Sequence, residues 1–133
     1  MLVEVVGTVV GERGAVLAEV RTPVGAVTVR WCGDQEPSVG AHEVEWELDA
    51  DFRWGHDVRR VEGRSEWLRQ HQREIIFRGR SHLADEEPSL VHLELAGSVI
   101  DLGWVEGMPT DLPDPWVEVR VLAEKVALHP YLV

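Results

Sequence analysis

The sequence predicts an all-β protein with one short helix, in which two related four-stranded antiparallel units form a sandwich or a partly open barrel. Three observations support this fold class. Short apolar segments alternate with polar residues at the period of a strand, Gly and Pro interrupt them at close intervals, and the second half of the chain echoes the first. At 133 residues the chain is predicted to form a single domain, 1–133.

The first half contains four predicted strands. Val3 to Val10 is rich in valine and is followed by Gly11, while Ala15 to Arg21 and Ala26 to Trp31 alternate apolar and polar residues on either side of a turn. The segment from His42 to Asp49 has the cleanest alternation in the protein. These strands make up the first predicted β unit, 1–56.

The segment 57–73 breaks the strand pattern and is predicted to be a helical linker. Ser65 is a suitable N-cap residue, and Trp67, Leu68 and His71 follow it at helical spacing. We therefore expect the one helix at Ser65 to Gln72.

The second predicted β unit, 74–133, repeats the pattern of the first. Its expected strands are Ile75 to Arg80, Ser89 to Leu95, Ser98 to Trp104, Trp116 to Leu122 and Val126 to Tyr131, with an acidic loop at 84–88.

One numerical offset relates the two units. Adding 73 to the residue number carries Val20 onto Leu93 and Trp31 onto Trp104. It also carries the inward positions of the segment 42–49 onto those of 115–122. Because a strand has only two registers, a single match is weak, but agreement of several strands on one offset favours a pseudo-duplication.

Composition and charge exclude several classes of function. The formal net charge of −11 and the pI near 4.9 oppose binding to nucleic-acid phosphates. The arginines between 53 and 80 are interleaved with glutamates and are expected to be the solvated surface of the helix and its flanks. No apolar run is long enough for a membrane span, the start lacks the features of a signal peptide, and Cys32 is the only cysteine. We therefore expect a cytoplasmic protein that does not bind nucleic acid or membranes.

The most informative polar feature is a row of carboxylates on one face of the segment 42–49. Successive members lie roughly 7 Å apart along a strand and repel one another unless cations lie opposite. The offset does not reproduce these acids in the second unit, so the fold does not require them there. They are predicted to be either solvated surface or a binding face for a basic partner, formed by Glu43, Glu45, Glu47 and Asp49.

The chain contains six tryptophans. Trp31, Trp46 and Trp104 fall on apolar strand faces and are expected in the core. Trp54 and Trp116 lie beside loops, where a partly exposed indole can anchor an interface. Trp54 is close in sequence to the acid row, so it joins the predicted partner-binding residues.

Motifs for metals, cofactors or catalysis are lacking. The acidic set Asp49, Asp51, Asp111 and Asp114 does not match the spacing of an EF-hand loop, and the histidines form no HxH or HExxH motif, although His82 and His92 could meet across a hairpin. Cys32, Asp34 and His42 can be written as a nucleophilic set, but a buried inert cysteine is far commoner. No catalytic residue, metal ligand or cofactor is predicted.

These observations favour a non-catalytic protein-binding domain whose acidic face takes a basic partner. In charge and size the chain resembles the immunity proteins that neutralise bacterial toxins, which implies a basic toxin as partner. In strand count it resembles small tandem β-barrels of the oligonucleotide-binding type.

Two alternatives for the function remain open. One is a small-ligand-binding barrel or an enzyme with a pocket of Trp31, His42, Trp104 and His129. The other is a structural accessory domain of a larger assembly. In addition, edge strands such as Val3 to Val10 could pair to form a homodimer.

Overall fold

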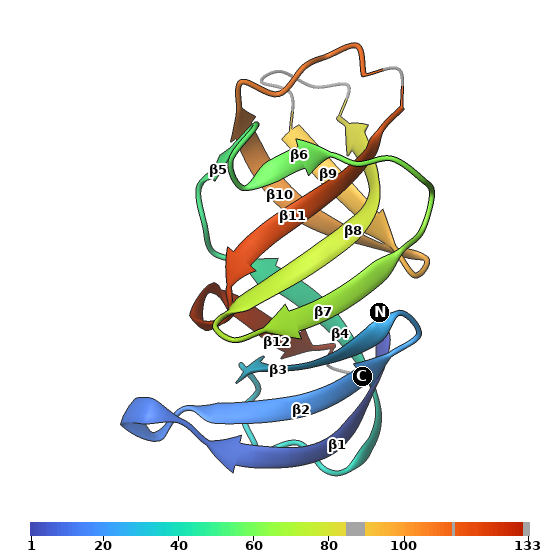
Figure 1. Cartoon of the computed structure of the whole chain (residues 1–133). Helices are drawn as coiled ribbons and strands as arrows, with labels where there is room; N and C mark the ends of the chain where they lie inside the picture. Colours follow the sequence, from blue (N-terminus) through green and yellow to red (C-terminus); the bar gives the residue numbers. More distant parts are fainter. Residues whose placement is uncertain (85–89, 113, 132–133) are drawn as a thin grey trace.

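A computed structural model describes residues 1–84, 90–112 and 114–131 and confirms a mostly β protein (Figure 1). Two single-turn 3₁₀ helices, η1 (Glu12–Gly14) and η2 (Ala123–Lys125), are the helical elements of the described residues. The strands follow in chain order: β1 (Leu2–Val10), β2 (Val16–Thr22), β3 (Gly25–Trp31), β4 (Gly40–Leu48), β5 (Phe52–Arg53), β6 (Val58–Arg60), β7 (Trp67–His71), β8 (Glu74–Leu83), β9 (Leu90–Leu95), β10 (Ser98–Glu106), β11 (Trp116–Leu122) and β12 (Val126–Pro130).

The strands form a closed barrel and a second curved sheet, which lie one above the other in Figure 1. The barrel has the order β1-β2-β3-β12-β4, closed by the pairing of β1 with β4. The second sheet has seven strands, in the order β5-β10-β9-β8-β11-β6 with β7 paired to β8. Part of the predicted acidic loop, 85–88, lies outside the described residues.

Each sheet is completed by strands from the other half of the chain. The last strand, β12, pairs in parallel with β3 and antiparallel with β4 in the barrel. Conversely, β5 pairs in parallel with β10, and β6 pairs antiparallel with β11, in the second sheet. The chain therefore passes between the sheets twice, and both crossings hold the two sheets together.

If the two halves were structural repeats, adding 73 to both residues of a strand pair in the first half should give a strand pair in the second half. Among the described strands, the pairing of β2 with β3 meets this condition. Val20 pairs with Val27 in the first sheet, and Leu93 pairs with Ile100 in the second, as adding 73 requires. The pairing of β8 with β11, by contrast, has a different register from that of β1 with β4. The pseudo-duplication therefore stays a prediction.

The predicted helix at Ser65 to Gln72 is wrong, because this segment contains β7. Leu68 is buried against the core, its amide donates to the Val24 carbonyl oxygen at 3.0 Å, and β7 pairs antiparallel with β8. Gln72 has a φ of 56°, which ends β7 in a tight turn and is incompatible with a helix. Tertiary pairing thus overrides the local helical spacing, and the linker 57–73 contains strands instead.

The core is one continuous apolar cluster that spans both sheets. Trp46 of the barrel meets Phe77 of the second sheet edge to face, with 5.7 Å between the ring centroids. At the junction of β3 and β7, a Cβ on Gly25 would overlap the carbonyl oxygen of Leu68. The two sheets therefore pack so closely there that only glycine fits.

Candidate functional site: an acidic cleft

The predicted acid row lies on the outer face of β4. Val44, Trp46 and Leu48 are buried, whereas Glu43, Glu45 and Glu47 between them are exposed, and Asp49 follows the end of the strand. The alternation therefore places the acids as the sequence predicts.

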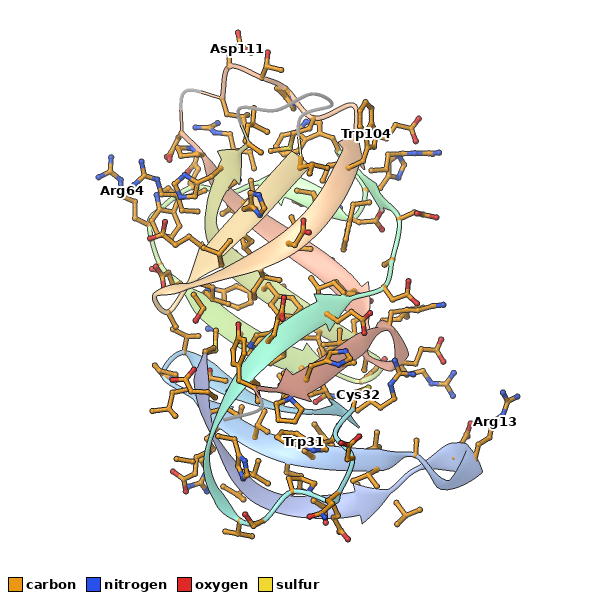
Figure 2. All side chains as sticks on the ribbon, turned by 180° about the vertical axis from the view of Figure 1, so that it is seen from behind. Arg13, Trp31, Cys32, Arg64, Trp104 and Asp111 are labelled. Atoms are coloured by element: carbon orange, nitrogen blue, oxygen red, sulfur yellow. The ribbon has the colours of Figure 1, made fainter. Side chains whose placement is uncertain are left out.

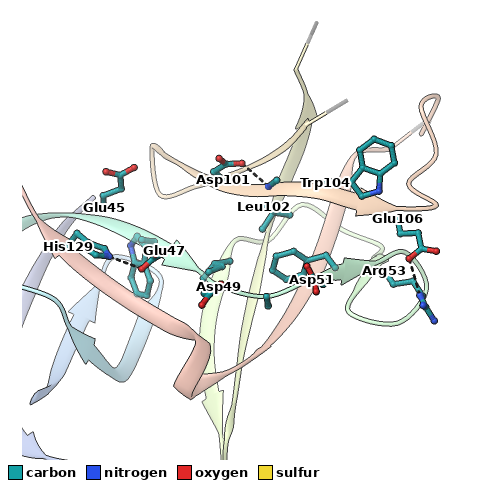
Figure 3. Close-up of a pocket in the computed structure, with 15 residues that line it drawn as sticks. Glu45, Glu47, Asp49, Asp51, Arg53, Asp101, Leu102, Trp104, Glu106 and His129 are labelled. Atoms are coloured by element: carbon teal, nitrogen blue, oxygen red, sulfur yellow. Dashed lines mark hydrogen bonds and ion pairs between the residues drawn. The ribbon is translucent and has the colours of Figure 1, made fainter. Parts of the chain in front are cut away.

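Three members of the acid row, Glu45, Glu47 and Asp49, line a cleft of about 880 Å³ that runs along the C-terminal half of β4 and past its end (Figure 3). One wall comes from β4, β12 and the segment 49–53, and the other comes from β10. Six carboxylates line the cleft: Glu45, Glu47, Asp49, Asp51, Asp101 and Glu106. Apolar residues also border it: Trp104 is exposed there, whereas Trp46, Leu48, Phe52 and Leu102 are buried beneath it.

Among the residues that the structure describes, the side chains lining the cleft that carry or can carry a positive charge are Arg53 and His129. The Arg53 Nε atom is 3.6 Å from Glu106 Oε2, and both side chains are largely exposed. His129 Nε2 is 2.8 Å from Glu47 Oε2. Both pairs are drawn in Figure 3. Exposed pairs of this kind contribute little, so most of the negative charge in the cleft remains uncompensated.

The repulsion within the acid row is large enough to matter. Two unit charges roughly 7 Å apart on a strand interact by about 0.6 kcal/mol in bulk water and about 2.4 kcal/mol at the effective dielectric constant near a protein surface. Salt reduces these values further. A cation bound between Glu45 and Glu47 would relieve this repulsion.

Trp104 is expected in the core from the strand pattern, but in the structure it is exposed at the cleft. A β-bulge between Asp101 and Gly103 shifts the register of β10 against β9, so Leu102 and Val105 point inward and Trp104 points outward. Gly103 has a φ of 66°, and its amide donates to Asp101 Oδ1 at 2.7 Å. As a result, the Trp104 side chain is 57% exposed at the cleft.

The structure separates two of the predicted binding residues from the cleft. Glu43 is 3.6 Å from the buried N-terminal amine of Met1 and does not line the cleft. Trp54 is half-buried against the core, and its backbone amide donates to the Glu106 carbonyl oxygen. Trp54 does not line the cleft, whereas Trp104 does, and a binding role for Trp54 stays a prediction.

The pocket predicted from Trp31, His42, Trp104 and His129 is not assembled as one site. Trp31 is buried and meets His42 edge to face, with 5.3 Å between the ring centroids. Trp104 and His129 instead line the acidic cleft.

The Cys32, Asp34 and His42 set is also not assembled. His42 Nε2 lies 2.7 Å from the Ser38 carbonyl oxygen, and within the described residues no hydrogen bond joins His42 to Cys32.

The weaker metal candidates are dispersed. Asp49 and Asp51 line the cleft, whereas Asp111 lies at the far end of the second sheet (Figure 2). His82 and His92 do pair across β8 and β9, but His82 bonds to Glu94 at 2.7 Å. Among the described residues, no group of three or more His, Cys, Asp or Glu side chains could hold a metal ion.

Comparisons with protein-family models, with curated proteins and with solved structures give no match for this chain. In the ranges that the structure describes, none of the helices has the length and apolarity that crossing a membrane would need.

Proposed function

We propose that this chain is a non-catalytic protein-binding domain whose acidic cleft takes a basic segment of a protein partner. The specific form of this proposal is an immunity-type inhibitor in the bacterial cytoplasm, with a basic toxin as its partner. The observation that carries it is the convergence of six carboxylates from both sheets around apolar side chains and one exposed tryptophan.

The composition of the cleft suits the side chains of arginine and lysine. Both carry a long apolar stem and a cationic head, so the stem can pack on the exposed Trp104 ring while the head meets the carboxylates. Trp104 can add a cation–π contact at the opening, and buried tryptophans are typical interface anchors. The volume of about 880 Å³ is in the range of ligand pockets and accommodates a few such side chains.

The same charges argue against an anionic ligand in this cleft. A phosphate or carboxylate would enter a field set by six acids and only two basic side chains. A basic protein surface gains from this field in two ways, through faster association and through relief of the repulsion within the acid row.

A binding measurement tests the proposal. The probe is a fluorescein-labelled decapeptide of alternating arginine and serine, and the readout is fluorescence anisotropy at low and high salt. The cleft variant carries Glu45→Gln, Glu47→Gln and Asp49→Asn. A control variant with the same change in net charge carries Glu12→Gln, Glu19→Gln and Glu124→Gln, which are exposed and do not line the cleft.

We expect the native protein and the control to bind the peptide, and the cleft variant to bind about tenfold more weakly or worse. Equal losses in both variants would show that net charge alone attracts the peptide and would contradict the proposal. Spermine serves as a small cationic competitor. If spermine binds in the cleft far more tightly than the peptide does, the small-ligand alternative replaces the protein partner.

A further inference from the structure

A second charged surface, of opposite sign, covers the outer face of β6, β11, β8 and β7, the strands nearest the viewer in Figure 1. We call it the arginine face and define it by five arginines, one tryptophan and one glutamate: Arg59, Arg69, Arg78, Arg80, Arg120, Trp67 and Glu118. Four of the five arginines fall in the stretch that the sequence assigns to the surface of a helix and its flanks. The strands instead align them on one face.

The register places four of these residues side by side in one row. Arg59 lies opposite Glu118, Glu118 lies opposite Arg78, and Arg78 lies opposite Trp67. Arg120 and Arg69 lie on either side of Ile76 in the next row of the same face. Paired residues share a face of a sheet, so their side chains point in the same direction.

Glu118 organises the centre of the arginine face. It is only 7% exposed although it points away from the core. Arg78 Nη2 donates to Glu118 Oε1 at 3.1 Å, and Arg120 Nε donates to Glu118 Oε2 at 3.3 Å. One buried carboxylate therefore fixes two guanidinium groups, and most of their N–H donors remain for another acceptor.

The Trp67 ring stacks against the guanidinium groups of Arg69 and Arg78. The Arg69 and Arg78 guanidinium carbons lie 4.3 and 4.4 Å from the centroid of its ring, which is cation–π geometry. The Nε atom of Arg78 is buried and has no hydrogen-bond partner within the described residues. Arg78 is therefore held in place with an unsatisfied donor, which is unusual for a group at the centre of a solvated surface.

The charge balance of the arginine face is positive on a protein with a net charge of −11. Asp49, Asp51 and Asp57 line a small pocket beside Arg120 at one edge of the arginine face, so these acids lie near that edge and not near Arg78 and Arg80. Glu94, opposite Arg80, accepts from His82 at 2.7 Å, and Glu74 pairs with His71 and Leu122 at the far end of the strands. The arginine face is therefore a locally positive surface on an acidic chain, and its charge is complementary to an anionic ligand.

We propose that the arginine face docks an acidic segment of a protein partner. Its carboxylates would accept bidentate hydrogen bonds from the guanidinium groups that Glu118 and Trp67 fix in place. Because Arg69, Arg78 and Arg120 are held in place before binding, these three lose little side-chain entropy on binding. This site lies on a different face from the acidic cleft, although Arg120 shares a pocket with Asp49 and Asp51 of the cleft, and it goes beyond the function proposed for the cleft.

A nucleic acid is the less suitable occupant. Single strands bind by stacking bases on exposed aromatic rings, and the Trp67 ring already carries two guanidinium groups. A long polyanion would also extend beyond the arginine face onto a surface that is negative overall, whereas a short acidic segment can be confined to the arginines.

The test compares two anionic probes of similar length. One is a fluorescein-labelled decapeptide of glutamate and aspartate, and the other is a fluorescein-labelled ten-nucleotide oligothymidine. The variant carries Arg59→Gln, Arg69→Gln and Arg80→Gln, which leaves the contacts of Glu118 intact. The control carries Arg13→Gln, Arg21→Gln and Arg30→Gln, which are exposed on the barrel and change the net charge equally.

We expect the acidic peptide to bind the native protein and the control, to weaken with salt, and to bind the variant at least tenfold more weakly. Loss of binding in both variants, or no binding of the peptide to the folded native protein, would overturn the proposal. Tighter binding of the oligothymidine than of the peptide would also overturn it, because the arginine face would then be a nucleic-acid surface. The basic peptide that tests the acidic cleft gives a separate result, so either site can fail alone.

Discussion

The acidic cleft and the arginine face differ in how each arranges its like charges. In the cleft, the glutamates of β4 line a solvent-filled space, and two of the six acids have a basic neighbour. On the arginine face, one nearly buried glutamate forms ion pairs with two arginines and holds both in place. A carboxylate thus stabilises the fold where it lies between arginines, as Glu118 does, and destabilises it where it lies beside other carboxylates, as in the cleft.

The two equivalent tryptophans of the predicted repeat give the largest expected contrast. Trp31→Ala should lower the free energy of unfolding by about 3 to 5 kcal/mol, because Trp31 is 7% exposed in the barrel core. Trp104→Ala should change it by less than about 0.5 kcal/mol, because Trp104 is exposed at the cleft. Urea unfolding measures both values. A large loss for Trp104→Ala would mean that this side chain is in the core and not at the cleft.

The close contact between β3 of the barrel and β7 of the second sheet depends on Gly25. A substitution there should weaken the packing of the two sheets. Gly25→Ala should cost about 3 kcal/mol, because the new Cβ overlaps the Leu68 carbonyl oxygen and the backbone has a φ of 151°. Gly7→Ala in β1 is the matched control, since its Cβ would meet Glu19 at an ordinary 3.6 Å. Thermal unfolding of the two variants compares them, and equal stability would show that the sheets do not pack closely at this point.

The same chemical change should have opposite effects in the two charged regions. Glu118→Gln should lower the free energy of unfolding by about 1 to 3 kcal/mol, because it removes the charge that compensates Arg78 and Arg120. This range is below that of a fully buried pair because the two arginines are partly exposed. Chemical unfolding at low salt provides the measurement. A stable Glu118→Gln variant would mean that the arginines do not depend on this carboxylate.

In the cleft, Glu45→Gln should raise the free energy of unfolding by about 1 kcal/mol at low salt, because it removes the repulsion of Glu45 with a glutamate on either side. The gain should fall as salt is added, since exposed charges are screened. Unfolding curves at low and high ionic strength check the sign. A loss of stability at low salt would show that Glu45 makes a stabilising interaction in the native protein.

The period-two pattern was sufficient to predict most strands, and it correctly placed the acids of β4 opposite Val44, Trp46 and Leu48. It failed where non-local pairing decides the structure. The residues of β7 have helical spacing, yet the free edge of β8 and the Val24 carbonyl draw them into a strand. In β10, a bulge exchanges which residues point inward and which point outward. The sequence signals for this bulge are a glycine within the strand, Gly103, and an aspartate two residues before it, Asp101.

The cleft itself could be predicted only in part. The acids of β4 are local in sequence, but Asp101, Trp104 and Glu106 join them through the packing of β10 beside the segment that follows β4. The residue pattern of β10 or of the segment 49–53 does not reveal that the two lie side by side. The arginine face has the same cause, because its row is assembled from residues on four different strands.

The central claim is that the acidic cleft binds a basic segment, and amide chemical-shift mapping by NMR tests it most directly. The isotope-labelled protein would be titrated with the arginine–serine decapeptide at low salt. We predict that shift changes concentrate in β4, in residues 49–53 and in residues 101–106, and that they disappear in the variant with Glu45→Gln, Glu47→Gln and Asp49→Asn. Shifts spread over all exposed acids, or confined to a region away from the cleft, would contradict the claim.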